Sequence, residues 1–277
     1  MTARAAAAEA LRLSAAALFA FPLGWMALTA LLPESEALAD VPRIAPAHWT
    51  LDNFRQAFAS YPLALWCRNS VIAAALTALA TIAMSAPAAF ALSRLPFRGR
   101  TALLQLLIGA MLVPAEVTLP ALFLGLSRAG LSDTFASLAG PVAVNGLGLF
   151  LLVQFFRTIP QELLDAAALE GSNAGGQLIR IVLPLSVPAL ATVALLSFAA
   201  SWNNFLWPLI VTNSDATRTL PVGLASFLGS VAGSATSMRY GLTMAASCVA
   251  TLPPLILFLA LSSRFERGIA LGAGIRR

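Results

Sequence analysis

Six apolar stretches, each long enough to cross a lipid bilayer, dominate the sequence. A membrane span needs about 20 mainly apolar residues. Hydrophobic residues make up 59% of the 277, and charged residues only 10%, whereas a soluble domain is usually about 25% charged. This excludes an ordinary soluble enzyme, a disordered chain and a nucleic-acid binder with the usual basic patch. The sequence predicts an all-α integral membrane protein with one membrane domain, residues 1–277. Its six transmembrane helices are expected at residues 13–32, 70–93, 102–126, 134–156, 185–211 and 241–263.

Side chains that could carry chemistry are scarce. The chain has no lysine, one histidine (His48) and two distant cysteines, Cys67 and Cys248. A Walker-type phosphate-binding loop needs a lysine, as does a Schiff base, so both are excluded. A single histidine leaves no partner for a His-rich metal site or a Ser-His pair, and the cysteine spacing does not indicate a disulfide framework. We therefore expect no catalytic residue, no metal ion and no cofactor bound by this chain.

The distribution of arginines predicts the orientation of the chain. Six spans place both termini on one side of the membrane. With the termini inside, the inner segments hold 11 of the 17 arginines and the outer segments hold 6. Cytoplasmic loops carry an excess of basic residues, so both termini are expected to be cytoplasmic. The short 94–100 loop, with three arginines and no acid, is the clearest signal. In the outer loop 33–69, residues 49–60 are expected to form a short amphipathic surface helix.

One cytoplasmic loop, residues 157–184, is too long for a simple turn and too polar to span. Thr158 can cap a helix, and Pro160 suits a first helical turn. Glu162 and Asp165 come early, where acids interact favourably with the helix dipole. The first half of the loop is therefore predicted to be a helix.

The second half of this loop carries a stop signal and a new start. Gly171 suits the left-handed conformation that ends a helix. Ser172 or Asn173 can cap a second helix, which Pro184 should limit. The loop thus indicates a helix, a sharp bend and a helix at the inner membrane surface. It is either a docking element for another protein or a simple connection between two spans.

The amino-acid sequence of this loop favours a docking element over a simple connection. It has Asp165, Ala166, Ala167 and Gly171 in the segment DAAALEG, then nine residues, then IVLP at residues 181–184. This resembles the E-A-A-x-x-x-G-x(9)-I-x-L-P signature of the integral membrane subunits of bacterial ABC importers. The departure is the leading acid, an aspartate here, which keeps the charge but shortens the side chain by one methylene.

Further tracts resemble the carbohydrate-uptake branch of these importers, in particular MalG-type permeases. The resemblance covers most of the chain from about residue 60 onward. The matching tracts are RNS at 68–70, LSRLPF at 92–97, WNNFLWP at 202–208 and the tail at 267–274.

The resemblance implies a type I ABC importer permease in the bacterial cytoplasmic (inner) membrane. A separate pair of ATP-binding subunits would bind ATP and Mg²⁺, and the segment from Glu162 to Gly171 would be the coupling helix seated on them. A second homologous permease would supply the other half of the pathway for a carbohydrate or related polyol. An extracytoplasmic solute-binding protein would deliver the solute.

Glu116 is the first candidate for the substrate pathway. It lies in the third stretch between Pro114 and Pro120, and prolines remove backbone hydrogen bonds, so we expect a bent helix with freed carbonyls. Acids inside a membrane are costly and usually face protein or water. Glu116 is either a gate or solute-facing acid, or a structural acid paired with an arginine or backbone donors of a neighbouring helix. A self-sufficient secondary transporter or channel could also use Glu116, but it would not explain the loop 157–184.

The fifth stretch offers a second set of pathway candidates: Trp202, Asn203 and Asn204. Amides can bind sugar hydroxyls, and an indole can stack on an apolar sugar face. Alternatively, the asparagines bond between helices, and the tryptophans, with Trp207 the strongest case, belong to an interfacial belt. Asn145 and Gln154 of the fourth stretch are weaker candidates.

Overall fold

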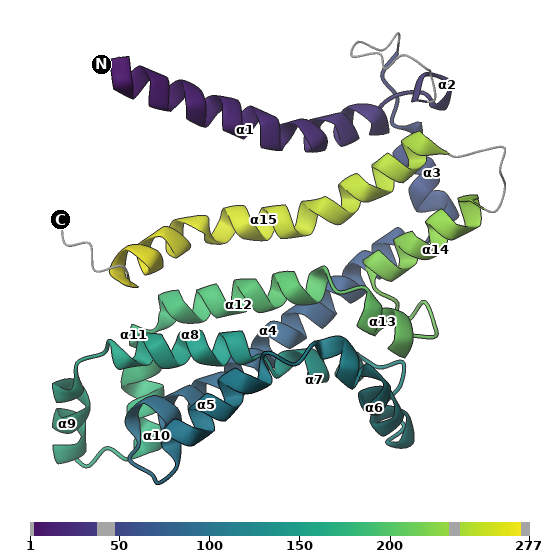
Figure 1. The fold of residues 1–277 in the computed structure, drawn as a ribbon. Helices are drawn as coiled ribbons and strands as arrows, with labels where there is room; N and C mark the ends of the chain where they lie inside the picture. The colour runs from purple at the N-terminus through teal and green to yellow at the C-terminus, as the bar shows by residue number, and fades with distance from the viewer. Residues whose placement is uncertain (1–2, 38–47, 233–238, 273–277) are drawn as a thin grey trace. The chain divides into compact units, whose positions relative to one another are not determined.

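The computed structural model describes residues 3–37, 48–232 and 239–272, which form helices and no strand (Figure 1). The end of the tail at 267–274 lies outside these residues. Within them, three helices are long and apolar enough to cross a bilayer alone. They are α1 (Ala3–Ala30), α4 (Leu63–Arg94) and α15 (Tyr240–Gly272).

Three further apolar segments are helix pairs with a sharp bend. The pair α5 (Arg100–Ala110) and α6 (Ala115–Arg128) bends by 95°, and α7 (Phe135–Ala143) and α8 (Gly146–Arg157) bend by 50°. Residues 174–185 meet α12 (Val187–Trp202) at 80°. If each bent pair is one span, the described residues hold six spans.

Two of these bends have a local cause in the sequence. Pro114 is extended (φ −58°, ψ 131°) and directly precedes α6, as the proline pair in this stretch predicted, whereas Pro120 lies inside α6 without a break. Asn145 is also extended and caps α8, its Oδ1 accepting the Leu147 N–H at 2.9 Å. The span boundaries and the single-domain organisation stay predictions.

Short helices connect these segments. In the loop predicted at residues 33–69, α3 occupies most of the tract predicted to be a surface helix. The short elements are α2 (Glu34–Ala37), α3 (Asp52–Ser60), α9 (Gln161–Leu169), α10 (Ala174–Gln177), the π-helix η1 (Leu178–Val182), α11 (Leu183–Leu185), α13 (Leu206–Val211) and α14 (Leu220–Ala232).

The chain divides into two compact units, residues 1–67 with 222–253 and residues 68–221 with 254–277. In the first unit, the buried Asn53 of α3 donates to the Ala30 and Leu32 carbonyls at 2.9 and 2.7 Å. These bonds fix α3 against the carboxyl end of α1, whose last carbonyls have no partner within the helix.

The second unit contains a core that includes the end of α4 and helices α8 and α12, which lie side by side (Figure 1). Phe156, Leu152 and Val153 of α8 are fully buried there, and Val193 of α12 is 1% exposed. This core also includes Leu164 of α9, so the loop of residues 157–184 is attached to the apolar helices by apolar packing.

Candidate functional site

Helix α9 occupies the first half of the loop of residues 157–184, as predicted. Leu164 is its buried residue, at 3% exposure. Leu163 and Leu169 are exposed, at 46% and 91%. Glu162 and Asp165 are also exposed, so α9 rests on the membrane domain through one leucine and presents other apolar side chains outward.

The end of α4 holds the start of this loop. The Arg94 Nε donates to the Phe156 carbonyl at 3.0 Å, its Nη2 donates to the Phe156 and Ile159 carbonyls, and its Nη1 donates to Gln161 Oε1 at 2.9 Å. Gln161 in turn donates to Asp165 Oδ1 at 2.9 Å. Hydrogen bonds from a charged donor are the stronger ones, so Arg94 is the main polar link between α4 and α9.

Gly171 ends α9 in the left-handed conformation, with φ at +86°, as the sequence predicted. The Ser172 N–H bonds to the Ala167 carbonyl at 2.9 Å, and the Gly171 N–H bonds to the Ala168 carbonyl at 3.0 Å. This is the Schellman pattern, which favours glycine because a Cβ is disfavoured at positive φ.

The helix after this bend differs in part from the prediction. Asn173 is the cap, with its Oδ1 accepting the Gly176 N–H at 2.8 Å. The prediction that Pro184 limits this helix was wrong, because helical structure continues through η1 and α11 to Leu185. The π-helical turn changes the hydrogen-bond register just before the proline, which has no N–H to donate, and the break falls at Ser186.

Thr158 also has a different place from the one predicted. Its Oγ1 donates to the Phe155 carbonyl at 2.7 Å, so it closes the end of α8 and does not cap α9. Pro160 occupies the position before α9 and makes no side-chain cap. Residues 158–160 separate the two helices, and the cap position of α9 falls on Pro160, which has no side-chain acceptor.

The substrate-pathway candidates lie around breaks in the helices of the second unit. The break between α5 and α6, the break between α7 and α8, and the turn between α12 and α13 all line one cavity of about 490 Å³. Interrupted backbone at membrane depth is tolerated where it is buried or lines a cavity. The residues that line this cavity include Met111, Val113, Val144, Asn145, Asn204 and Trp207.

The structure separates the four predicted pathway residues. Asn204 lines the cavity and accepts the Trp207 N–H at 3.4 Å. Asn203 is exposed, and its amide donates back to the Ala199 carbonyl at 2.9 Å. Trp202 is buried at 3% exposure and stacks on Phe198, with ring centroids 6.0 Å apart. Glu116 is exposed in the first turn of α6 and is not part of the cavity lining.

Trp207 does not belong to an interfacial belt. It is 3% exposed, and its indole Nε1 donates to the Ser137 carbonyl at 2.8 Å. It packs in a cluster with Ala73, Leu138 and Val211. The turn at residues 203–205 redirects α13 into the protein, so the ring is carried inward. Periodicity along a straight helix could not predict this.

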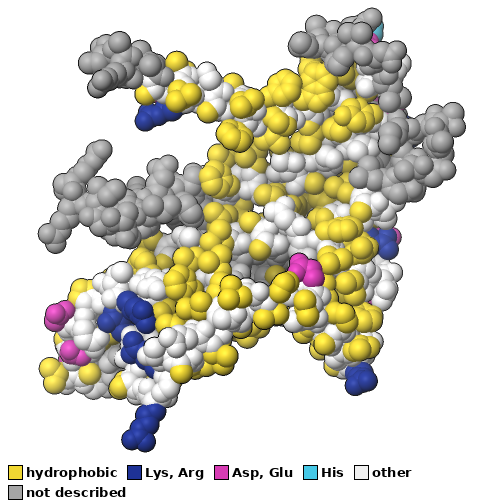
Figure 2. All heavy atoms as spheres, viewed as in Figure 1, with side chains coloured by type: hydrophobic (Ala, Val, Ile, Leu, Met, Phe, Trp, Pro, Cys, Tyr) yellow, Lys and Arg dark blue, Asp and Glu magenta, His cyan; other side chains and the backbone are white. Residues whose placement is uncertain are grey.

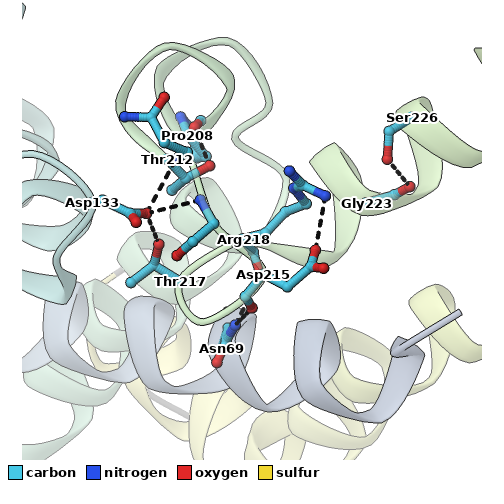
Figure 3. Close-up of polar contacts among 11 residues, drawn as sticks. Asn69, Asp133, Pro208, Thr212, Asp215, Thr217, Arg218, Gly223 and Ser226 are labelled. Atoms are coloured by element: carbon cyan, nitrogen blue, oxygen red, sulfur yellow. Dashed lines mark hydrogen bonds and ion pairs between the residues drawn. The ribbon is translucent and has the colours of Figure 1, made fainter.

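At the end of α13, the loop of residues 212–219 is held by side chains from two other helices or their flanks (Figure 3). Asn69 of α4 is buried, and its amide donates to the Asp215 and Arg218 carbonyls, both at 3.0 Å. Ser70 Oγ accepts the Leu220 N–H at 2.8 Å. The RNS tract at 68–70, noted for its resemblance, therefore fixes this loop.

Asp133 holds the same loop from the start of α7 (Figure 3). It has a left-handed backbone (φ 58°), which aspartate tolerates better than most residues. Its Oδ1 accepts the Asn213 N–H at 3.1 Å, the Ser214 N–H at 3.4 Å and the Thr217 hydroxyl. Burial opposes ionisation of this carboxyl, but the hydrogen bonds outweigh it and lower its pKa. Sequence reasoning missed Asp133, because no motif marks it.

The described residues contain no group of three or more His, Cys, Asp or Glu side chains that could hold a metal ion. Their surface is largely apolar in Figure 2, with basic side chains gathered at the end of the second unit that carries α9. Leu112, at 85% exposure, and Phe19, at 79%, are examples of the exposed apolar side chains. Such a surface suits lipid or partner chains.

Comparisons with known proteins agree with this architecture. The family described as "Binding-protein-dependent transport system inner membrane component" matches residues 81–271. The chain is 32% identical over 257 residues to the trehalose/maltose transport system permease protein MalG of Thermococcus litoralis, covering 91% of this chain and 90% of the relative. It is 31% identical over 255 residues to the arabinooligosaccharides transport system permease protein AraQ of Halalkalibacterium halodurans, covering 91% and 90%.

The fold is also that of a solved transporter. A crystal structure of a bacterial ABC transporter involved in the import of the acidic polysaccharide alginate matches with a TM-score of 0.81 and 20% identity, covering 94% of this chain and 96% of that one. The predicted all-α type I permease fold is confirmed, and the relatives are transport permeases, not enzymes. A self-sufficient secondary transporter is not favoured. The family match covers more than half of the chain, and the relatives exceed 30% identity along most of both sequences. This chain therefore belongs to the binding-protein-dependent transport system inner membrane components, the permease subunits of ABC importers, which work with an ATPase and a binding protein.

Proposed function

We propose that this chain forms half of the translocation pathway for a carbohydrate or related polyol in an ATP-driven importer. The relatives are named for trehalose and maltose and for arabinooligosaccharides, and the solved transporter imports alginate. These solutes share many hydroxyls on an apolar ring, so a carbohydrate is the class that best fits all of them.

The observation that carries the proposal is the exposed helix α9. Leu163 and Leu169 present apolar surface away from the membrane domain, and Ala166 is small and exposed. An apolar helix face that its own chain leaves uncovered is suited to a groove on another protein. A pair of ATP-binding subunits, holding ATP and Mg²⁺, would supply that groove.

In this account the coupling residues have separate tasks. Glu162 and Asp165 offer charges to basic groups of the ATPase, while Ala166 and Ala167 allow close approach. Gly171 sets the bend that ends α9. Movement of α9 would reach the membrane helices through Leu164, which packs in their core, and through Arg94 of α4.

The cavity at the helix breaks is the proposed solute path on this chain. Asn204 and Asn145 line it with amides, while Trp207 and Met111 supply apolar surface. A second homologous permease would close the other side, and Glu116 lies exposed at the start of α6, available to that partner or to the solute. Trp202 and Asn203 would support the turn at 203–205 from outside the cavity.

The remaining partners follow from the predicted orientation. With both termini in the cytoplasm, α9 meets the ATPase on the inner side, and an extracytoplasmic solute-binding protein approaches from the other. The arginine distribution supports this placement.

The test is coupled uptake by the reconstituted importer. Leu163→Glu with Leu169→Glu should abolish uptake and binding-protein-stimulated ATP hydrolysis, because two charges would enter an apolar contact. Ile179→Glu, which changes another exposed apolar residue of the same loop, is the matched control and should retain uptake. Retained uptake in the double variant would contradict the docking role.

The substrate class is tested separately with labelled maltose, an arabinooligosaccharide, glycerol and, as a non-carbohydrate, an amino acid. Uptake of a sugar or polyol, lost in Asn204→Leu but not in Asn213→Leu, would support the proposal. Uptake of the amino acid alone would overturn the carbohydrate assignment while leaving the importer assignment intact.

A further inference from the structure

The turn between α4 and α5 in the second unit forms an open cavity of about 820 Å³. Three arginines line it: Arg98 and Arg100 from the turn and the start of α5, and Arg157 from the end of α8. In the described ranges, the ion pairs involve Arg12, Arg55 and Arg218, and none of the three cavity arginines faces an acid in such a pair. The cavity is therefore strongly basic and uncompensated.

The same cavity has an apolar side. Pro96, Phe97 and Leu104 share the lining, and the Phe97 ring is 42% exposed. Along α5, Leu103 and Leu106 are exposed at 42% and 68%. The arginines thus lie at the start of α5 and the end of α8. Next to them are the exposed leucines of α5, whose apolar side chains favour contact with another apolar group.

We propose that this cavity binds the phosphate head group of an anionic phospholipid from the cytoplasmic leaflet. Arginine forks match phosphate oxygens in a bidentate geometry. The cytoplasmic leaflet is the anionic one, and basic pockets between membrane helices on that side bind lipid head groups. The exposed leucines of α5 favour a lipid over a soluble phosphate, because acyl chains would cover them.

The test uses the purified complex that contains this chain, titrated with phosphatidylglycerol or phosphatidylcholine and examined by native mass spectrometry. The variant Arg98→Gln with Arg100→Gln should lower the apparent affinity for phosphatidylglycerol on the order of 30-fold, since each basic residue near the surface contributes about 1 kcal/mol. The matched control, Arg55→Gln with Arg128→Gln, removes the same charge from exposed positions elsewhere and should leave the affinity unchanged.

Unchanged phosphatidylglycerol binding in the first variant would overturn the proposal, as would equal binding of the two lipids by the wild type. Displacement of the lipid by millimolar inorganic phosphate would assign the cavity to a soluble anion instead. If the double variant does not fold, Phe97→Trp provides a second measurement. Its added fluorescence should be quenched more strongly by brominated phosphatidylglycerol than by brominated phosphatidylcholine, and equal quenching would contradict the site.

Discussion

Two connecting segments of the second unit, the loop of residues 212–219 and the helix α9, are built in opposite ways. Thr212, Thr217 and Thr219 of the loop are buried, at 7%, 7% and 4% exposure. By contrast α9 buries Leu164 and leaves Leu169 91% exposed. Hydrogen bonds from Asn69 and to Asp133 and Ser70 fix the loop within its own chain, whereas the surface of α9 is incomplete by itself. This difference is what the proposed docking of α9 on a partner requires, whereas the loop of residues 212–219 is closed by its own chain.

The largest effect is expected where α4 is joined to α9 and to the end of α8. Arg94→Ala removes the donor to two carbonyls and to Gln161 Oε1, and unpaired buried acceptors are costly, so the free energy of unfolding should fall by about 3 kcal/mol. Arg94→Lys keeps the charge but not the forked guanidinium, so its free energy of unfolding should lie between those of the wild type and Arg94→Ala. Thermal unfolding in detergent checks both, with the exposed Arg128→Ala as the control. A change no larger than that of Arg128→Ala would show that α9 is held by other contacts.

The second-largest effect is expected in the loop of residues 212–219. Asn69→Ala removes both amide hydrogen bonds that reach the 212–219 loop, and the free energy of unfolding should fall by about 2 kcal/mol. Asn213→Ala keeps the backbone N–H that bonds to Asp133 and changes an exposed side chain, so it should be near neutral. Hydrogen exchange should rise in residues 212–219 of Asn69→Ala and stay unchanged in 161–171. An equal rise of hydrogen exchange in both segments would contradict the proposal that the two segments are held independently.

The bend after α9 should be less sensitive. At Gly171 an added Cβ would meet no atom within 4 Å, but φ is +86°, so Gly171→Ala should cost about 1–2 kcal/mol through backbone conformation alone. Gly175→Ala, in α10 with an ordinary 3.7 Å contact to Asn173 Oδ1, should be neutral or stabilising. Thermal unfolding of the two variants, with coupled uptake, separates backbone strain from the general effect of replacing glycine by alanine, which raises helix propensity. An equal response of both glycines would contradict the Schellman account.

The smallest expected effect concerns pH. The hydrogen bonds lower the Asp133 pKa below its ordinary value of 3.8, so the carboxylate stabilises the folded loop above that value, and this contribution is lost as the pH falls through the lower folded pKa. The difference in thermal midpoint between wild type and Asp133→Asn should therefore be present at pH 6 and shrink toward pH 3. A difference that does not depend on pH would mean that the charge has no part in holding the loop.

Sequence reasoning succeeded where one local rule decides the structure. Gly171 needs no tertiary information to end α9, and Pro114 directly precedes α6, at the break where a proline has no N–H to continue the helix. The apolar stretches and the coupling signature predicted the fold class and the family that the comparisons confirmed.

The rest depended on contacts between distant residues. The sequence predicts Trp207 to be an interfacial ring, but the turn at 203–205 places it in the core. Asp133 has no local signature, and the RNS tract marks Asn69 without showing what it contacts, because their partners lie about 80 and 150 positions along the chain. Pro184 failed as a stop because a π-helical turn rearranged the hydrogen bonds before it. These outcomes need the packed structure.

The most direct test of the central claim is hydrogen exchange of this permease with and without its ATP-binding subunits. We expect strong protection of residues 161–171 when the ATPase is present, because its groove would cover Leu163, Ala166 and Leu169. Exchange in residues 212–219 should not change, since that loop is closed by its own chain. No added protection in 161–171, or equal protection in both segments, would contradict the account.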